Sequence, residues 1–269
     1  MKAKHFDELF DRYLMLAKRE DNSLTEDILP HALKLQENAI KYKYFDGAYA
    51  MACALDNYMD LRGLNKERIS VLKYGVKFST RKDENYATNS FFLGKAYLNV
   101  SKFRKSLECF SNALNVSREI GHREGEAADV GSLGLAYEAL GDAPKAIDLY
   151  EEALIISREI SHRQGEGANV GNLGNAFASL GKMTKAINLY EQALTISREI
   201  GNRKSEGIDL GNLGKVYADL GDISKAINFY EQALTISREI GHRQGEGTYL
   251  GNLGNAYACL LYTSDAADE

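Results

Sequence analysis

Apolar residues recur along most of the chain with a helical spacing. In one stretch they stand at i, i+3, i+7 and i+10, namely Val170, Leu173, Phe177 and Leu180. The same spacing resumes at Ile187 after an interruption at Gly181. Because apolar residues at this spacing fall on one face of a helix, the pattern predicts two amphipathic helices separated by a short turn.

This two-helix pattern is repeated with a constant period. A Leu-Gly pair recurs every 40 residues, at positions 133–134, 173–174, 213–214 and 253–254, and a weaker copy stands at 93–94. Periods of 20 to 50 residues are typical of solenoids, in which each unit buries its apolar face only against its neighbours. The chain is therefore expected to be an array of helix pairs.

Turn residues mark the ends of the predicted helices. Gly141 and Asp142 stand between the two helices of one unit, where glycine favours a left-handed C-terminal cap and aspartate an N-cap. Lys182 replaces the aspartate in the next unit. The second helices are expected to stop at one residue per unit: Gly121, Ser161, Gly201 and Gly241.

The residues within one unit carry a family resemblance. They are Leu173, Gly174 and Phe177 on the first helix, and Ala186, Tyr190 and Ala193 on the second. This pattern resembles the tetratricopeptide repeat (TPR) family, and its 40-residue units are similar to those of Pins-like G-protein-signalling modulators, kinesin light chains and TPR arms of bacterial signalling proteins. The family's usual unit is shorter and often closes with proline, which is missing here. The resemblance implies an all-α fold, a right-handed α-solenoid of antiparallel helix pairs (a TPR superhelix).

The resemblance divides the chain into four parts. Residues 1–45 are expected to form an N-terminal helical segment, with helices near 6–18 and 25–43, and residues 46–85 a degenerate TPR-like unit in which Arg68 stands where a small residue is expected. Residues 86–258 form the array, whose last unit is truncated. Residues 259–269, CLLYTSDAADE, resemble translated sequencing adapter and predict that the natural protein is longer. Without a second helix, Leu253 and Tyr257 are expected to face solvent.

Composition excludes several classes of function. The chain has 33 Lys+Arg against 38 Asp+Glu, a net charge of -5 with neither sign concentrated, so nucleic acid is not an expected partner. The cysteines Cys53, Cys109 and Cys259 form neither a disulfide framework nor a zinc motif. With no signal peptide and no long apolar run, we expect a cytoplasmic protein that does not contact membranes.

The first helices of the array supply candidate binding residues. In a TPR superhelix they line the concave side, and the positions that flank the Leu-Gly core are Asn172, Asn175, Asn212, Lys215, Asn252 and Asn255, with Lys95 upstream. The family resemblance implies that the residue just after the core glycine holds the backbone of a peptide. Asparagine suits this role because its amide both donates and accepts. Alternatively, Asn172, Asn212 and Asn252 join adjacent repeats by hydrogen bonds.

Enzyme chemistry is not predicted. His122, His162 and His242 recur once per unit, but helices of adjacent units stand at least about 8 Å apart, too far to share one metal ion. The repeated Gly-x-x-Gly at 171–174 lies inside a predicted helix and lacks the strand and lysine of a phosphate loop. Arg163 and Glu166 are expected to form an i, i+3 ion pair. No cofactor, metal site or catalytic residue is expected.

The sequence therefore favours a protein–protein interaction module that binds a peptide or partner protein in its groove, as an adaptor or scaffold. Two alternatives stay open. In the first, the chain is a fragment of a larger signalling ATPase or caspase-like protease protein and serves as its sensor or regulatory arm. In the second, it is a small bacterial repeat protein that binds a secreted peptide signal.

Overall fold

The computed structural model describes residues 30–31, 33–34, 38, 52, 55–56, 59–60, 63–78 and 83–268, without the side chains of 262–268. Every regular element in this part of the chain is a helix. The two helices predicted before residue 45 fall almost wholly outside the described residues.

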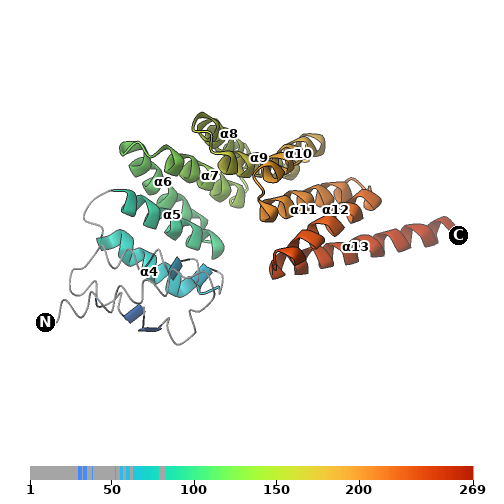
Figure 1. Ribbon diagram of the computed structural model, residues 1–269, viewed down its shortest axis with the longest axis horizontal. Helices are drawn as coiled ribbons and strands as arrows, with labels where there is room; N and C mark the ends of the chain where they lie inside the picture. Colours follow the sequence, from blue (N-terminus) through green and yellow to red (C-terminus); the bar gives the residue numbers. More distant parts are fainter. Residues whose placement is uncertain are drawn as a thin grey trace. The chain divides into compact units, whose positions relative to one another are not determined.

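The chain divides into two compact units, whose helices are labelled in Figure 1. Unit 1, Met1–Leu140, contains α4 (Asn65–Phe78), α5 (Glu84–Asn99), α6 (Phe103–Glu119) and α7 (Arg123–Ala139). Unit 2, Gly141–Glu269, contains α8 (Ala143–Glu159), α9 (Arg163–Ser179), α10 (Met183–Glu199), α11 (Arg203–Asp219), α12 (Ile223–Glu239) and α13 (Arg243–Asp268).

Consecutive helices pack against one another inside each unit. Alternate helices also touch, α5 with α7 in unit 1, and α9 with α11 and α11 with α13 in unit 2. In TPR terms α5, α7, α9, α11 and α13 are first helices of their repeats. The prediction of an all-α fold of helix pairs in tandem is confirmed.

The Leu-Gly core of each pair forms an interlock between the two helices. Leu173 and Leu213 are buried, and the glycine beside each leaves room for an aromatic ring from the second helix. A Cβ added to Gly174 would lie 2.6 Å from Cε1 of Tyr190, which shows how closely the ring covers that glycine. Phe110 covers Gly94 and Tyr230 covers Gly214 in the same way. The aromatic residue of the second helix therefore packs within its own pair.

The predicted turn chemistry is confirmed in detail. Gly141, Gly181 and Gly221 all have positive φ, and the Asp142 side chain accepts a hydrogen bond from the Lys145 backbone N–H at 3.1 Å. Lys182 makes no side-chain cap hydrogen bond, as its departure from the pattern predicted. The residues that end the second helices share a left-handed backbone: Gly121, Ser161, Gly201 and Gly241, with φ between 56 and 69°.

Ser161 is the one non-glycine residue of these four turns, so replacing it is a test of backbone strain. A left-handed residue with a Cβ costs about 1 kcal/mol relative to glycine. We expect Ser161→Gly to raise the free energy of unfolding by about that amount and to raise the melting temperature, measured by circular dichroism. The matched change Gly201→Ser, at φ 67°, should lower the free energy of unfolding by a similar amount. A stabilising Gly201→Ser variant would contradict the strain argument.

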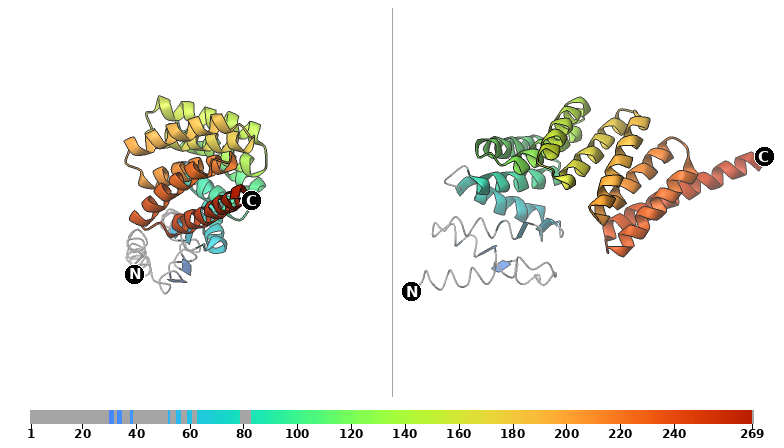
Figure 2. Two further views of the ribbon diagram at one scale, coloured as in Figure 1. Left: turned by 90° about the vertical axis from the view of Figure 1, so that its right-hand side faces the viewer. Right: turned by 45° about the horizontal axis from the view of Figure 1, so that its top comes forward.

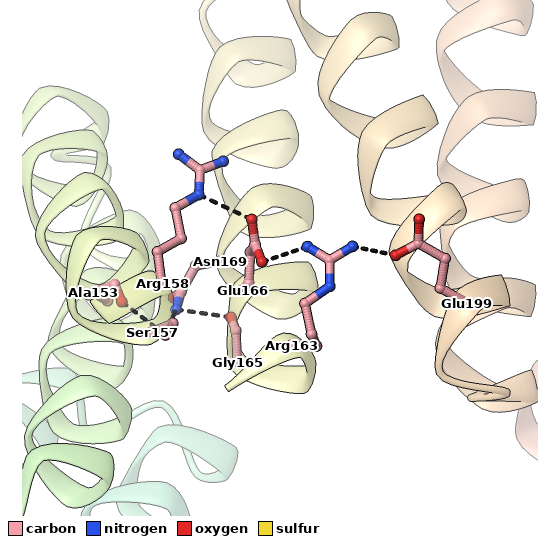
Figure 3. A network of polar contacts seen from close by, with 8 residues as sticks. All are labelled: Ala153, Ser157, Arg158, Arg163, Gly165, Glu166, Asn169 and Glu199. Carbon is pink, nitrogen blue, oxygen red and sulfur yellow. Dashed lines mark hydrogen bonds and ion pairs between the residues drawn. The ribbon is translucent and has the colours of Figure 1, made fainter. Parts of the chain in front are cut away.

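Ion pairs join neighbouring helices along unit 2 (Figure 3). The expected i, i+3 pair forms, with Arg163 Nη1 donating to Glu166 at 2.5 Å. Glu166 also accepts from Arg158 Nε at 2.9 Å, across the junction between α8 and α9, and Arg163 pairs with Glu199 of α10. Burial raises the pKa of Glu166, but the two arginines outweigh it and hold that pKa below its usual range. The network links three successive helices.

The last helix differs from the others in length. α13 has 26 residues where α7 to α12 have 17 each, and in Figure 2 its end projects beyond α12. The expectation for its apolar residues is half right. Tyr257 is exposed and donates to Glu231 of α12 at 3.0 Å, whereas Leu253 is buried although no second helix covers it. Leu253 is buried because α12 already packs against α13.

In the degenerate unit, Arg68 of α4 is fully buried, in place of the small residue that the family pattern expects. Its guanidinium donates to both oxygens of Asp56, at 2.6 and 2.9 Å, and pairs with Asp60. Leu72, one turn later, is buried in an apolar cluster that includes Leu55 and Met59. An ion pair therefore occupies part of the core of unit 1.

Candidate functional site

A pocket opens in unit 2 between the first helices of two successive repeats, α9 and α11. Its volume is about 180 Å³. Three of the predicted groove residues line it: Asn172 and Asn175 from α9, and Asn212 from α11. The end of α10 contributes Ile196 and Ile200. The sequence therefore identified three residues that the fold brings together.

Small residues on α9 create the space for this pocket. Gly167 and Gly171 line it, and a Cβ on Gly171 would come within 3.5 Å of Oδ1 of Asp209. In the next interval, between α11 and α13, the corresponding space is filled. There the ring of Tyr249 covers Gly211 and its hydroxyl donates to the Gly207 carbonyl at 2.9 Å. Whether the space between two first helices is open therefore depends on the residue at the position of Asp209, which is Tyr249 one repeat later.

Two of the four asparagine amides that line the pocket are held in defined orientations. The Tyr190 hydroxyl donates to Oδ1 of Asn175 at 2.7 Å, which directs the amide oxygen toward α10. Oδ1 of Asn202, the N-cap of α11, accepts from the Ser205 backbone N–H at 3.0 Å. Fixed amides suit hydrogen bonding to an extended backbone, since they lose little freedom on binding.

Asp209 is the acidic residue of the pocket. It is only 6% exposed, and its Oδ2 accepts from the Ser197 hydroxyl at 2.8 Å. Burial raises the pKa of Asp209 to about 6; the Ser197 hydrogen bond opposes this rise and the charge of Glu206 adds to it. No hydrogen bond to Oδ1 is found within the described part of the chain, where that atom faces Gly171.

The repeat before it carries asparagine at the same position, Asn169 (Figure 3). Asn169 Nδ2 donates to the Gly165 carbonyl at 2.9 Å and approaches Ser157 Oγ at 3.4 Å. At Asn169 a neutral amide therefore fits with its Nδ2 group hydrogen bonded. A buried carboxylate is harder to accommodate, because burial disfavours its charged form.

Replacing Asp209 by asparagine tests this difference as a function of pH. Because the pKa rises from 3.8 to about 6 on folding, the folded state holds this proton more tightly, and stability falls as pH rises through that window. We expect Asp209→Asn to be more stable than the parent at pH 8 and equal to it near pH 3.5, in urea unfolding curves. Asp219→Asn, which removes an exposed charge from the same helix, should show little of this dependence. Equal gains at both pH values would contradict the prediction.

Unit 1 contains a second pocket at the equivalent place, between α5 and α7, with a volume of about 380 Å³. Its acidic residue is Asp129, 80 residues before Asp209, which accepts from Ser117 at 2.7 Å. Burial raises the pKa of Asp129 to about 7, with the Ser117 hydrogen bond opposing and the Glu126 charge adding. Phe91 and Phe92 form one wall. The two pockets share one plan.

The other predicted groove residues lie elsewhere. Lys215 on α11 and Asn255 on α13 are exposed outside the lining of the unit 2 pocket, and Asn252 on α13 is half-buried. Lys95 lies in unit 1, with Nζ 5.8 Å from the ring centroid of Phe91. Their part in binding stays a prediction.

The family follows from comparison with known sequences. The model of the tetratricopeptide repeat matches residues 85–159, 166–239 and 210–266. This chain belongs to the tetratricopeptide repeat family. No curated protein matches it in sequence.

Several solved structures share the fold. A Rap protein complexed with Competence and Sporulation Factor has a TM-score of 0.73 and 17% identity, covering 96% of this chain and 75% of that one. BtubC (BKLC) from P. vanneervenii has a TM-score of 0.63 and 18% identity, and the match covers 86% of this chain and 92% of that one. A STAND signal-transduction ATPase with a tetratricopeptide repeat sensor, from Pyrococcus horikoshii, has a TM-score of 0.65 and 17% identity. The match covers 95% of this chain and 42% of that one. At these identities the likeness concerns the fold alone.

The recurrent histidines of the tetratricopeptide units stand at helix starts. His122 and His162 are the N-cap residues of α7 and α9, without a side-chain cap hydrogen bond. Among the described residues, no three His, Cys, Asp or Glu side chains gather in a way that holds a metal ion. Within the same part of the chain, no helix is both long and apolar enough for a membrane span.

The acidic residues are the part of the site that sequence reasoning missed. One signal was available: reading position 209 back in steps of 40 gives Asp209, Asn169, Asp129 and Asn89, with Tyr249 ahead. This position is polar in four repeats and aromatic in one, although at Asp209 and Tyr249 it lies on the helix face that meets the preceding repeat. A polar residue on a face that packs is an informative exception.

Proposed function

We propose that the chain is a protein–protein interaction module that binds a peptide or an extended segment of a partner protein along its first helices. The observation that carries this proposal is the unit 2 pocket, where Asn172, Asn175 and Asn212 converge between α9 and α11. Side-chain amides recognise a backbone without fixing the identity of the side chains it carries. This suits an adaptor or scaffold.

The structural neighbours support a peptide as the ligand class. One Rap neighbour was solved with Competence and Sporulation Factor, and another, the Rap conjugation gene regulator of plasmid pLS20, with the Phr* peptide. The second has a TM-score of 0.67 to this chain. The same fold thus holds a peptide in at least one other protein.

A pool of random seven-residue peptides tests the proposal. The full chain is immobilised and retained peptides are identified by mass spectrometry. We expect capture by the parent and at least about a tenfold loss in the triple variant Asn172→Ala, Asn175→Ala, Asn212→Ala, since each lost hydrogen bond is worth roughly 0.5 to 1.5 kcal/mol. Asn188→Ala, an exposed asparagine of α10 outside the pocket, is the control. Undiminished capture by a folded triple variant would show that these three asparagines do not bind the peptide.

A second candidate function has one observation in its favour. The STAND neighbour carries its tetratricopeptide repeats as the sensor of a larger signalling ATPase, and this chain covers 42% of that protein. The chain would then be a regulatory arm of a larger signalling protein, such as an ATPase or a caspase-like protease. Reading the genomic DNA across both ends of the frame decides this. A nucleotide-binding or protease domain in frame supports it, and stop codons close to both ends of the array remove it.

A further inference from the structure

We infer that the Asp209 pocket binds a positively charged nitrogen group, either the head of a lysine or arginine side chain with its alkyl stem or the N-terminus of a peptide. This inference rests on the proposed function, because it names the group of the bound segment that enters the pocket. Four observations carry it: the charge of the pocket, its apolar wall, the neutral residues that the adjacent repeats carry at the Asp209 position, and the second pocket of the same plan.

The charge of the pocket is unbalanced. Among the described residues that line it, Asp209 is the only ionisable one; the others are amides, hydroxyls, glycines and aliphatic groups. Glu206, one turn earlier on α11, is already paired with Arg198 and Arg203. The carboxylate of Asp209 meets a single hydroxyl, that of Ser197. A ligand that donates N–H bonds and carries positive charge completes this site, because charge-assisted hydrogen bonds are the strong ones.

The walls fit the stem that carries such a group. Ile196 and Ile200 at the end of α10, and Ile208 on α11, line the pocket. Ile200 and Ile208 are 38% and 44% exposed. Lysine and arginine pack their methylene stems on apolar surface and place the charged head at a polar site. The three isoleucines offer that surface beside Asp209.

The repeats on either side of Asp209 carry a neutral residue at the same position. Asn169 occupies the same position one repeat earlier with its amide hydrogen bonded, and Tyr249 fills the position one repeat later. A buried carboxylate without a cation is retained at a cost in stability, which is the expected behaviour of a residue selected for binding. Unit 1 repeats the arrangement with Asp129, and there Glu124, Phe91 and Phe92 line the pocket as well. Aromatic faces add attraction for a cation.

The direct test uses small probes on the full chain. In ¹H–¹⁵N spectra, n-butylammonium and n-butylguanidinium should cause saturable shifts of Gly171, Asn172 and Asn212, and neutral n-butanol should not. Asp209→Asn should abolish these shifts while the fold is kept, and Asp219→Asn should retain them. Asp209→Tyr, which copies Tyr249 and fills the space at Gly171, is a second variant that should abolish them. Equal shifts with n-butanol, or shifts that persist in Asp209→Asn, overturn the inference.

The peptide pool separates the two sources of the charge. Peptides captured by the parent should be enriched in Lys or Arg at one position if a side chain enters the pocket. They should be lost on N-terminal acetylation of the pool if the terminus enters. Asp209→Asn should remove either effect. Capture without preference for any cation overturns this inference and leaves the proposed function standing. Binding of n-butylammonium without capture of any peptide contradicts the proposed function and leaves the cation site of the pocket standing.

Discussion

Replacing Arg68 by leucine is expected to lower the free energy of unfolding by roughly 3 to 5 kcal/mol, because it leaves the Asp56 carboxylate buried without a partner. Arg68 is fully buried and Asp56 is 5% exposed. Burial raises the pKa of Asp56, although the Arg68 hydrogen bond and charge act against that rise. Without the guanidinium, the carboxylate loses the positive charge and hydrogen bonds that stabilise its ionised form, so it must take up a proton or draw in water.

The effect should be local, because repeat arrays are stabilised by neighbouring contacts. Hydrogen exchange is therefore the measurement, with peptides from α4 and α5 compared against those of α11 and α12. Exchange should accelerate in the first group and stay unchanged in the second. The double variant Arg68→Leu, Asp56→Leu should recover much of the loss, since apolar replacements of a buried pair are often neutral. A stable single variant, or a double variant no better than the single, would show that the ion pair does not hold this core.

The sequence predicts the repeat unit well because periodicity repeats every constraint. Leu173 and Leu213 are buried, Gly174 and Gly214 receive aromatic rings, and Gly141 takes the left-handed backbone that ends a helix. Each of these features depends on residues within one unit or on the equivalent residues of the next. Local rules of spacing, capping and side-chain size are sufficient to find them.

Features that depend on pairs of residues from different repeats were missed. The pocket exists because Gly171 on α9 faces Asp209 on α11, and it is closed one repeat later because Tyr249 replaces the aspartate. The asparagines at 172, 175 and 212 were identified from family resemblance, but the acidic residue between them required the register of α9 against α11. Arg68 was noticed as an exception to the pattern, but its partners lie on a preceding segment that the pattern does not place.

The glycine of the Leu-Gly core offers a test in which the same substitution has opposite signs at two repeats. Alanine is a better helix former than glycine by about 0.8 to 1.0 kcal/mol, so Gly→Ala is favourable wherever space permits. At Gly254 on α13 nothing stands within 4 Å of an added Cβ. At Gly174 the added Cβ would lie 2.6 Å from Cε1 of Tyr190, a ring that is 3% exposed and cannot swing away.

We therefore expect Gly174→Ala to lower the free energy of unfolding by roughly 1 to 3 kcal/mol, the usual cost of overpacking a core. Gly254→Ala should raise it by up to about 1 kcal/mol, as an exposed helix position does. Urea unfolding followed by circular dichroism gives both values. The double variant Gly174→Ala, Tyr190→Leu should regain part of the loss, because leucine removes the atoms that clash. If Gly174→Ala is as stable as Gly254→Ala, the ring of Tyr190 does not seat on that glycine, and the interlock that joins the two helices of a repeat must come from the flanking leucine and alanine contacts instead.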